Sequence, residues 1–282
     1  MIDPTVLNNM LIQNRIGRQY YLRDDDTLME KHLARENGPY QVRNLRFLRG
    51  QCPSARTIID VGANIGMNTI EYATWCATVE AFEPSPDTYQ RLLDNIALNQ
   101  SYTPQGRYYH QGQYQHLSDY SDGWWSIDTG WASLKMTARI NTYSQALGRC
   151  NTQGRLLGNN RGLADYVIEL NNIMTVEDAI SIATIDSYNF SEVDIIKIDT
   201  EGTEWNIVQG ADHTITQQRP IVQVEMYGWE RRLGINNQHM LDYFKSLNYI
   251  MLDYRGQTLP WTTQKIKGVM DRFFVPQEKY RD

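Results

Sequence analysis

The feature that most restricts the fold of this sequence is a short apolar run that ends in a glycine turn. Residues 57–62 (TIIDVG) have the composition of a buried strand, and residues 64–77 carry apolar side chains on roughly one helical face. A second apolar run at 79–83 ends in Glu83, and Ser85 and Pro86 then suit the start of a helix. Strands and helices that alternate in this order predict a parallel sheet with crossover helices.

The later sequence continues this α/β pattern. Residues 193–199 and 220–225 are apolar runs typical of buried strands, whereas a third strand at 106–114 is only weakly indicated. A helix is expected at 239–247, with a closing antiparallel strand pair at 249–254 and 272–275.

The chain divides at two places where this pattern is absent. We predict an N-terminal helical extension over 1–56 and an α/β domain over 57–282. Residues 118–165 have no clear period and are predicted to be an insert that walls the pocket. Its tryptophans (Trp124, Trp125, Trp131) suit contact with a sugar, but they are equally suited to anchoring a loop or forming a subunit contact.

Charge and composition exclude several classes of protein. The net charge is −6 and the pI is about 5.4, so binding to nucleic acid through bulk electrostatics is not expected. No apolar stretch is long enough to cross a bilayer, and no membrane partner is predicted. Three distant cysteines, Cys52, Cys76 and Cys150, fit neither a disulfide framework nor a zinc site. Without a leader-like N-terminus, we expect a cytoplasmic protein; its oligomeric state stays open.

The glycine turn and Glu83 indicate a nucleoside-binding site. Glycine lets the backbone approach a ligand, and ligands of open α/β sheets bind beyond the carboxyl ends of the strands. Glu83 follows the first glycine by about 20 residues, the spacing at which an acid binds ribose hydroxyls. The alternative is that Gly62 and Gly66 only form a tight turn and that Glu83 is a solvated loop acid. Asn64 replaces the middle glycine of the dinucleotide fingerprint, which favours a ligand without pyrophosphate, such as S-adenosylmethionine.

A second group of acids follows the later strands. Asp199, Glu201 and Glu204 come after the run at 193–199, and Glu225 ends the next strand. In a parallel sheet these acids lie at the same edge as the glycine turn. A carboxylate at that edge can act as a general base and remove the proton of a substrate hydroxyl that accepts a transferred group. The alternative is that the glutamates only favour the positive end of a helix. A divalent metal is possible but not favoured, because no histidine joins the acids at a ligand spacing.

Several strings taken together resemble the FkbM family of S-adenosylmethionine-dependent methyltransferases. The resemblance covers residues 57–228, in the order expected for the family. It implies a Rossmann-like, mostly parallel seven-stranded sheet of the class I methyltransferase type, with helices on both faces. It also implies O-methylation of a hydroxyl, often on sugars or natural products. The strings are 60–66 (DVGANIG), 81–84 (AFEP) with Asn95 or Asn99 in the next helix, 184–187 (TIDS), 196–204 (IKIDTEGTE), 210–211 (GA) and 224–225 (VE).

We therefore expect an O-methyltransferase that acts on a sugar or another small-molecule or glycan acceptor with several hydroxyls. Asp199, Glu201 and Glu225 are the candidate catalytic acids. One alternative is a nicotinamide-dependent oxidoreductase, although the complete glycine fingerprint is missing. Another is a non-catalytic protein that keeps the cofactor pocket for an interaction. The candidate cofactor-binding residues are Asp60, Gly62, Ala63, Asn64, Gly66, Glu83 and Pro84.

Overall fold

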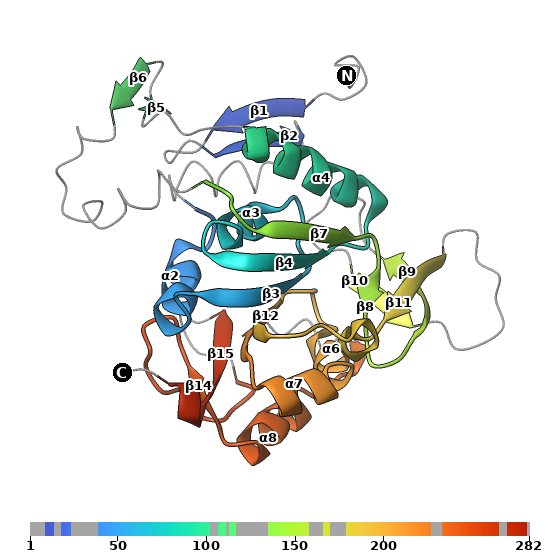
Figure 1. Ribbon diagram of the computed structural model, residues 1–282. Helices are drawn as coiled ribbons and strands as arrows, with labels where there is room; N and C mark the ends of the chain where they lie inside the picture. Colours follow the sequence, from blue (N-terminus) through green and yellow to red (C-terminus); the bar gives the residue numbers. More distant parts are fainter. Residues whose placement is uncertain are drawn as a thin grey trace.

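A seven-stranded sheet forms the centre of the molecule in the computed structural model (Figure 1). The strand order is β14-β15-β13-β12-β3-β4-β7, and neighbouring strands run parallel except β15, which is antiparallel to both β13 and β14. This confirms the predicted sheet and its closing antiparallel pair. The strands are β3 (Ala55–Val61), β4 (Cys76–Phe82), β7 (Arg139–Tyr143), β12 (Val193–Ile198), β13 (Ile221–Glu225), β14 (Tyr249–Leu252) and β15 (Asp271–Pro276). The structure describes residues 9–13, 18–23, 39–101, 107–110, 113–116, 135–157, 166–169, 179–226, 233–264 and 270–280.

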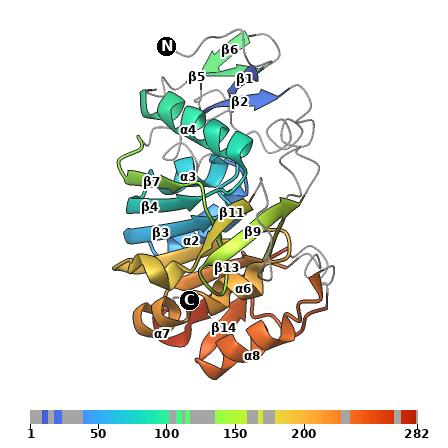
Figure 2. The ribbon, with the colours of Figure 1, turned by 90° about the vertical axis from the view of Figure 1, so that its right-hand side faces the viewer.

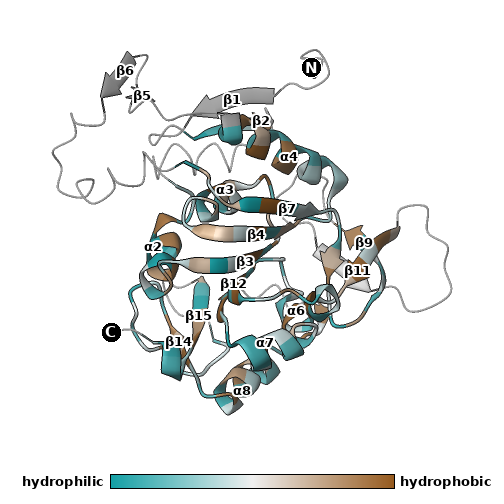
Figure 3. Ribbon diagram, in the orientation of Figure 1, coloured by the Kyte–Doolittle hydropathy of each residue, from teal (hydrophilic) through white to brown (hydrophobic). Residues whose placement is uncertain are grey.

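Helices cover both faces of this sheet because alternate strand residues are apolar on both sides. Ile58 and Ile59 of β3 are both fully buried, yet they belong to separate apolar clusters on opposite faces. The cluster of Ile58 includes residues of α2 (Val42–Gln51), α3 (Met67–Tyr72) and α4 (Pro86–Ser101). The cluster of Ile59 includes residues of α6 (Glu204–Gln209), α7 (Asp212–Gln218) and α8 (Gln238–Ser246). Hydrophilic colours predominate on α7, at the outside of the molecule (Figure 3).

Smaller sheets surround this core. A four-stranded sheet of order β10-β9-β11-β8 lies beside the carboxyl ends of the central strands, as the turned view shows (Figure 2). Two further pairs, β1–β2 and β5–β6, are antiparallel. None of the helices among the described ranges combines the length and the apolar character needed to cross a membrane. The remaining strands are β1 (Asn9–Gln13), β2 (Gln19–Arg23), β5 (Arg107–His110), β6 (Gln113–His116), β8 (Ala146–Leu147), β9 (Thr152–Leu157), β10 (Tyr166–Glu169) and β11 (Ala179–Ala183); two 3₁₀ helices span Ile185–Tyr188 and Gln277–Lys279.

The N-terminal region differs from the predicted helical extension over 1–56. The helix expected around Val42 is present as α2, but β1 and β2 form a hairpin upstream of it. In β2, Tyr20 and Leu22 are buried and the residue between them is only half-buried, which is the period of a strand. Strand β3 begins at Ala55, so the boundary drawn after residue 56 falls inside it. The helical pattern predicted around Leu28 lies outside the described residues.

The prediction for the third strand was wrong. Residues 107–110 and 113–116 pair with each other, and the strand beside β4 is β7. Strand β7 lies within the predicted insert 118–165, so this part of the insert belongs to the central sheet. It escaped prediction because it is an edge strand without a fully buried residue, and therefore lacks the apolar run of the inner strands. The insert's three tryptophans lie outside the described residues.

Candidate cofactor and acceptor site

A pocket opens at the carboxyl ends of β3 and β12. After β3 the chain continues to α3 on one face of the sheet, and after β12 it continues to α6 on the opposite face. This is the position at which open α/β sheets bind their ligands. The walls come from the glycine turn, from the segments that follow β4, β7, β12 and β13, and from Tyr40 before α2. Of the predicted site residues, the pocket is lined by Gly62, Ala63, Asn64, Glu83, Pro84, Asp199, Glu201 and Glu225.

The glycine turn has a backbone that ordinary residues rarely adopt. Gly62, Asn64 and Gly66 have φ angles of 77°, 50° and 89°, so every second residue is left-handed. A Cβ on Gly62 would lie 1.9 Å from the carbonyl oxygen of Asp199, which explains why the two loops can approach each other so closely. A Cβ on Gly66 would lie 2.7 Å from Leu92 of α4. Gly66 does not line the pocket and instead allows α4 to pack against the turn.

Glu83 is a structured acid rather than a solvated loop acid. Its side chain is 8% exposed, and each carboxylate oxygen accepts a backbone N–H, one from Asn64 at 3.0 Å and one from Ser85 at 2.9 Å. Glu83 also lines the pocket. The carboxylate therefore fixes the turn and still faces the pocket.

Asp60 lies beneath the turn and does not line the pocket. It is fully buried, and its carboxylate accepts the Thr69 hydroxyl at 2.6 Å and lies 3.3 Å from the Lys197 ammonium. Lys197 is buried as well and reaches the Gly62 carbonyl at 3.2 Å and Asp199 at 3.5 Å. Burial lowers the pKa of Lys197, but the negative charges of Asp60 and Asp199 raise it by more than burial lowers it. The net pKa is therefore above that of an ordinary lysine. Asp60 thus supports the site through Lys197.

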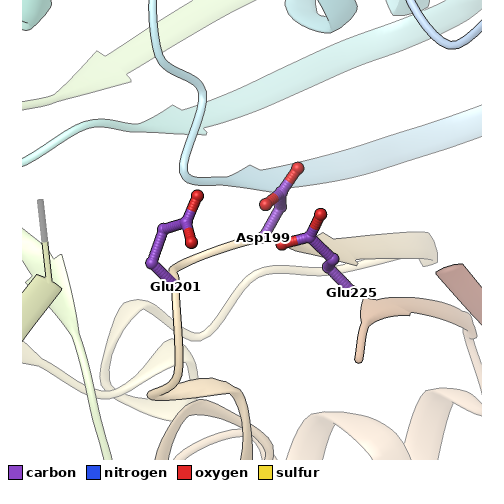
Figure 4. Close-up of side chains that lie close together, drawn as sticks. All are labelled: Asp199, Glu201 and Glu225. Carbon is purple, nitrogen blue, oxygen red and sulfur yellow. The ribbon is translucent and has the colours of Figure 1, made fainter. Parts of the chain in front are cut away.

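Asp199, Glu201 and Glu225 converge at one side of the pocket (Figure 4). Each offers a carboxylate oxygen, and these oxygens lie within 4.8 Å of one another. Burial, followed by the charges of Asp199 and Glu201, raises the pKa of Glu225 well above its ordinary value. These neighbours therefore favour the protonated form of Glu225, which shares a hydrogen bond with Asp199. Three of the four acids predicted to line one side of the cleft therefore meet, whereas Glu204 does not line the pocket.

Glu204 shapes the loop that carries two of these acids. One of its oxygens accepts the backbone N–H groups of Thr200 at 3.2 Å and Gly202 at 2.9 Å, and the Thr200 hydroxyl at 3.4 Å. Between them Glu201 has a left-handed φ of 59°, which directs the loop around the buried carboxylate. Burial raises the pKa of Glu204 to about 7.

Further residues of the site were not predicted from the sequence. Tyr40 lines the pocket, and burial and then the charge of Asp199 raise its pKa, so it remains a hydrogen-bond donor. The segment after β7 contributes Gln145, Ala146 and Leu147, and β9 contributes Leu156. These four residues lie within 118–165, the region expected to wall the pocket, although no motif in the sequence singles them out.

The three converging carboxylates also have the chemistry that hard divalent cations prefer. Lys197 already supplies positive charge to Asp199 at 3.5 Å. No histidine or cysteine joins the group in the part of the chain that the structure describes. The donor set is thus compatible with a cation, although the ammonium of Lys197 competes for one of its members.

One family profile and two solved structures, all of methyltransferases, are similar to this chain. The profile of the methyltransferase FkbM domain matches residues 60–251. A search of the curated proteins finds no significant match. Among solved structures, the chain resembles the methyltransferase FkbM from Methylobacillus flagellatus KT (17% identity, TM-score 0.45), and the alignment covers 79% of this chain and 44% of that one. It also resembles a TehB-like SAM-dependent methyltransferase from Corynebacterium glutamicum (9% identity, TM-score 0.41; 89% and 96% covered).

The chain therefore spans less than half the length of the FkbM structure that it matches. The family profile, in contrast, covers more than half of this chain and includes the glycine turn, Glu83 and all three converging acids. On that match, the chain belongs to the FkbM methyltransferase family.

Proposed function

We propose that this protein is an S-adenosylmethionine-dependent O-methyltransferase that acts on a hydroxyl of a sugar or another small polyhydroxylated acceptor. Family membership supports the reaction class. The observation that carries the choice of cofactor is the charge of the pocket, since the carboxylates of Glu83, Asp199 and Glu201 line it.

This acidic lining fits a cationic cofactor. S-adenosylmethionine carries a sulfonium and an ammonium group, and a cleft lined by one sign of charge attracts the opposite sign. Lys197 is the one cation among the described lining residues, and it is already paired with Asp60 and Asp199. A nicotinamide dinucleotide would bring a pyrophosphate over the turn, where Asn64 lines the pocket in place of the middle glycine of the dinucleotide fingerprint. The lining therefore favours the methyltransferase over the oxidoreductase.

The residues around the turn have distinct roles in holding the cofactor. Glu83 is placed to accept the two ribose hydroxyls, because it lines the pocket and two backbone N–H groups hold its carboxylate in position. An apolar wall suits the flat face of the base, and Phe82 of this wall is stacked on Tyr143 at 4.4 Å between ring centroids. The other apolar members of this wall are Pro84, Ala146, Leu147 and Leu156.

The acid cluster orients the acceptor and removes its proton. When bound, the cofactor supplies a methyl group on a sulfonium, whose loss leaves a neutral thioether. The acceptor hydroxyl needs to lose its proton as the new O–C bond forms. Burial and the neighbouring acids favour the protonated form of Glu225, so Asp199 and Glu201 are the members of the cluster that we assign to accept this proton. Several carboxylate oxygens within 4.8 Å of one another also suit an acceptor with neighbouring hydroxyls.

Calorimetry followed by a labelling experiment tests the proposal. We expect S-adenosylmethionine and S-adenosylhomocysteine to bind and NAD not to bind. Incubation with methyl-labelled cofactor and a panel of sugars and natural-product extracts is then expected to yield a labelled methyl ether. Asp199→Asn is expected to keep cofactor binding and lower turnover by about 10²-fold or more. Binding without any turnover would support the non-catalytic alternative, and binding of NAD alone would support the oxidoreductase.

A further inference from the structure

Asn95 of α4 connects the N-terminal hairpin to the cofactor turn. It is fully buried, and its Oδ1 accepts the backbone N–H of Tyr21 in β2 at 2.7 Å. Its Nδ2 donates to the carbonyl oxygen of Ile65 at 2.9 Å. Ile65 lines the pocket between the two left-handed residues Asn64 and Gly66. The side chain of Asn95 is thus hydrogen-bonded both to β2, which does not line the pocket, and to a peptide group of the pocket-lining turn.

Asn99, one helical turn further along α4, provides a natural comparison. It is 2% exposed, and its amide pairs with both backbone groups of Gln19, at 3.1 Å to the N–H and 2.7 Å to the carbonyl. It has no hydrogen bond to the glycine turn among the described contacts; its remaining bond is to the carbonyl oxygen of Asn95 at 2.8 Å. Both asparagines therefore hold β2 on α4, but only Asn95 reaches the turn.

The hairpin is firmly attached at this place. Tyr20 and Leu22 are fully buried against the core that also contains α3 and α4. Arg18 forms an ion pair of 3.1 Å with Glu71 of α3, and both side chains are at most 1% exposed. Since a buried charge that loses its partner is costly, these residues fix the position of β2 relative to the helix that follows the turn.

We propose that Asn95 is a positioning residue for the cofactor turn, and that through it the N-terminal strand β2 contributes to cofactor affinity. The Ile65 carbonyl belongs to the peptide unit that precedes Gly66, so the bond from Asn95 fixes the orientation of that unit. The N–H of the same unit donates to the Ala63 carbonyl oxygen at 2.9 Å, so loss of the Asn95 bond leaves the unit with one of these two anchors. The unit can then tilt and displace the pocket-lining backbone, for which a small misplacement is costly. This inference rests on the proposed cofactor.

A matched pair of variants in the full chain tests this role. Asn95→Leu and Asn99→Leu remove a buried amide of similar size from the same helix, and both leave backbone groups of β2 unpaired. We expect Asn95→Leu to weaken binding of S-adenosylhomocysteine by about tenfold in calorimetry, the equivalent of one lost hydrogen bond. Asn99→Leu is expected to lower the thermal midpoint of unfolding to a similar degree and to leave the affinity within about twofold.

The unchanged protein gives an independent readout, which applies even where a variant does not fold. If the contacts of Asn95 strengthen cofactor binding, then bound S-adenosylhomocysteine must stabilise those contacts to the same extent, because coupling between two sites is reciprocal. We expect saturating S-adenosylhomocysteine to slow hydrogen exchange of the Tyr21 amide more than that of amides in α8, which lies on the other face of the sheet.

The outcomes separate this inference from the proposed function. Absence of binding heat in the unchanged protein would overturn the proposed function and the inference together. Binding with equal affinity in both variants, or uniform protection of Tyr21 and α8, would overturn the role of Asn95 alone.

Discussion

The ammonium of Lys197 lies 3.5 Å from the carboxylate of Asp199 and joins a buried charge to the wall of the pocket. The lysine side chain is 3% exposed and that of Asp199 is 19% exposed. The same ammonium pairs with buried Asp60 and with the carbonyl of Gly62. Lys197 therefore holds the glycine turn and the loop after β12 in a fixed relation.

Removal of Lys197 is expected to destabilise the fold strongly. Lys197→Met leaves Asp60 fully buried without its cation, and loss of one partner of a buried pair costs about 3–5 kcal/mol. The double variant Asp60→Asn with Lys197→Met removes both charges and is expected to recover a large part of that loss. Urea unfolding of the two variants and the unchanged protein measures both effects. A single variant within about 1 kcal/mol of the unchanged protein would contradict this view of Lys197.

A methyl group on Gly62 is expected to separate the two loops of the site. The Cβ of Gly62→Ala would lie 1.9 Å from the carbonyl oxygen of Asp199, and the φ of 77° adds backbone strain. We expect a loss of several kcal/mol in the free energy of unfolding, because backbone atoms have to move. Gly50→Ala in α2 is the control, since nothing lies within 4 Å of its added Cβ. It is expected to be neutral or to stabilise by about 0.5–1 kcal/mol; equal effects of the two changes would refute the argument.

Much of the fold could be predicted from local sequence patterns. The inner strands β3, β12 and β13 are buried on both faces and appear as continuous apolar runs, so their positions and the site at their ends follow from the sequence. Strand β7 is at the edge of the sheet and only partly buried, so it has no such run. The segment after β7 was expected to wall the pocket as part of the insert 118–165, but its individual lining residues could not be named for the same reason.

Burial of polar groups could not be predicted from the sequence either. Lysine is a residue type that usually lies at the surface, yet Lys197 is buried. Its partners are Asp199, two residues further on, and Asp60 of β3, which is distant in sequence. Asp186 of the 184–187 string shows the same principle. Its carboxylate accepts the backbone N–H groups of His213 and Thr214, so it serves the start of α7 rather than a ligand. Such roles depend on partners that only the tertiary structure brings together.

Glu83→Gln is expected to weaken cofactor binding. The amide replaces one acceptor oxygen by a donor, so the bonds to the N–H groups of Asn64 and Ser85 cannot both persist. A hydrogen bond to a charged group contributes about 1.5–3 kcal/mol, which corresponds to at least about a tenfold loss of affinity for S-adenosylhomocysteine. Glu80→Gln is the control, since Glu80 lies on the same strand and accepts bonds from Asn141 and Tyr143. Calorimetry that gives equal affinities for the two variants would contradict the role of Glu83.

The last prediction concerns pH and the loop that carries Asp199 and Glu201. Burial raises the pKa of Glu204 from 4.5 to about 7, so the folded protein binds this proton more tightly than the unfolded chain does. Stability that this group contributes is therefore complete below about pH 4.5 and is lost as the pH rises through 7. A shift of this size corresponds to roughly 3 kcal/mol.

Glu204→Gln tests this dependence because it cannot titrate, while its amide oxygen can still accept the bonds from Thr200 and Gly202. We expect the free energy of unfolding of the unchanged protein to fall more steeply between pH 4.5 and 7 than that of the variant, measured by urea unfolding at several pH values. Asp271, whose pKa burial raises to about 6, contributes a slope of the same sign in both proteins and cancels in the comparison. Parallel pH profiles of the two proteins would show that Glu204 is already ionised in the folded state, and that its three donors outweigh its burial.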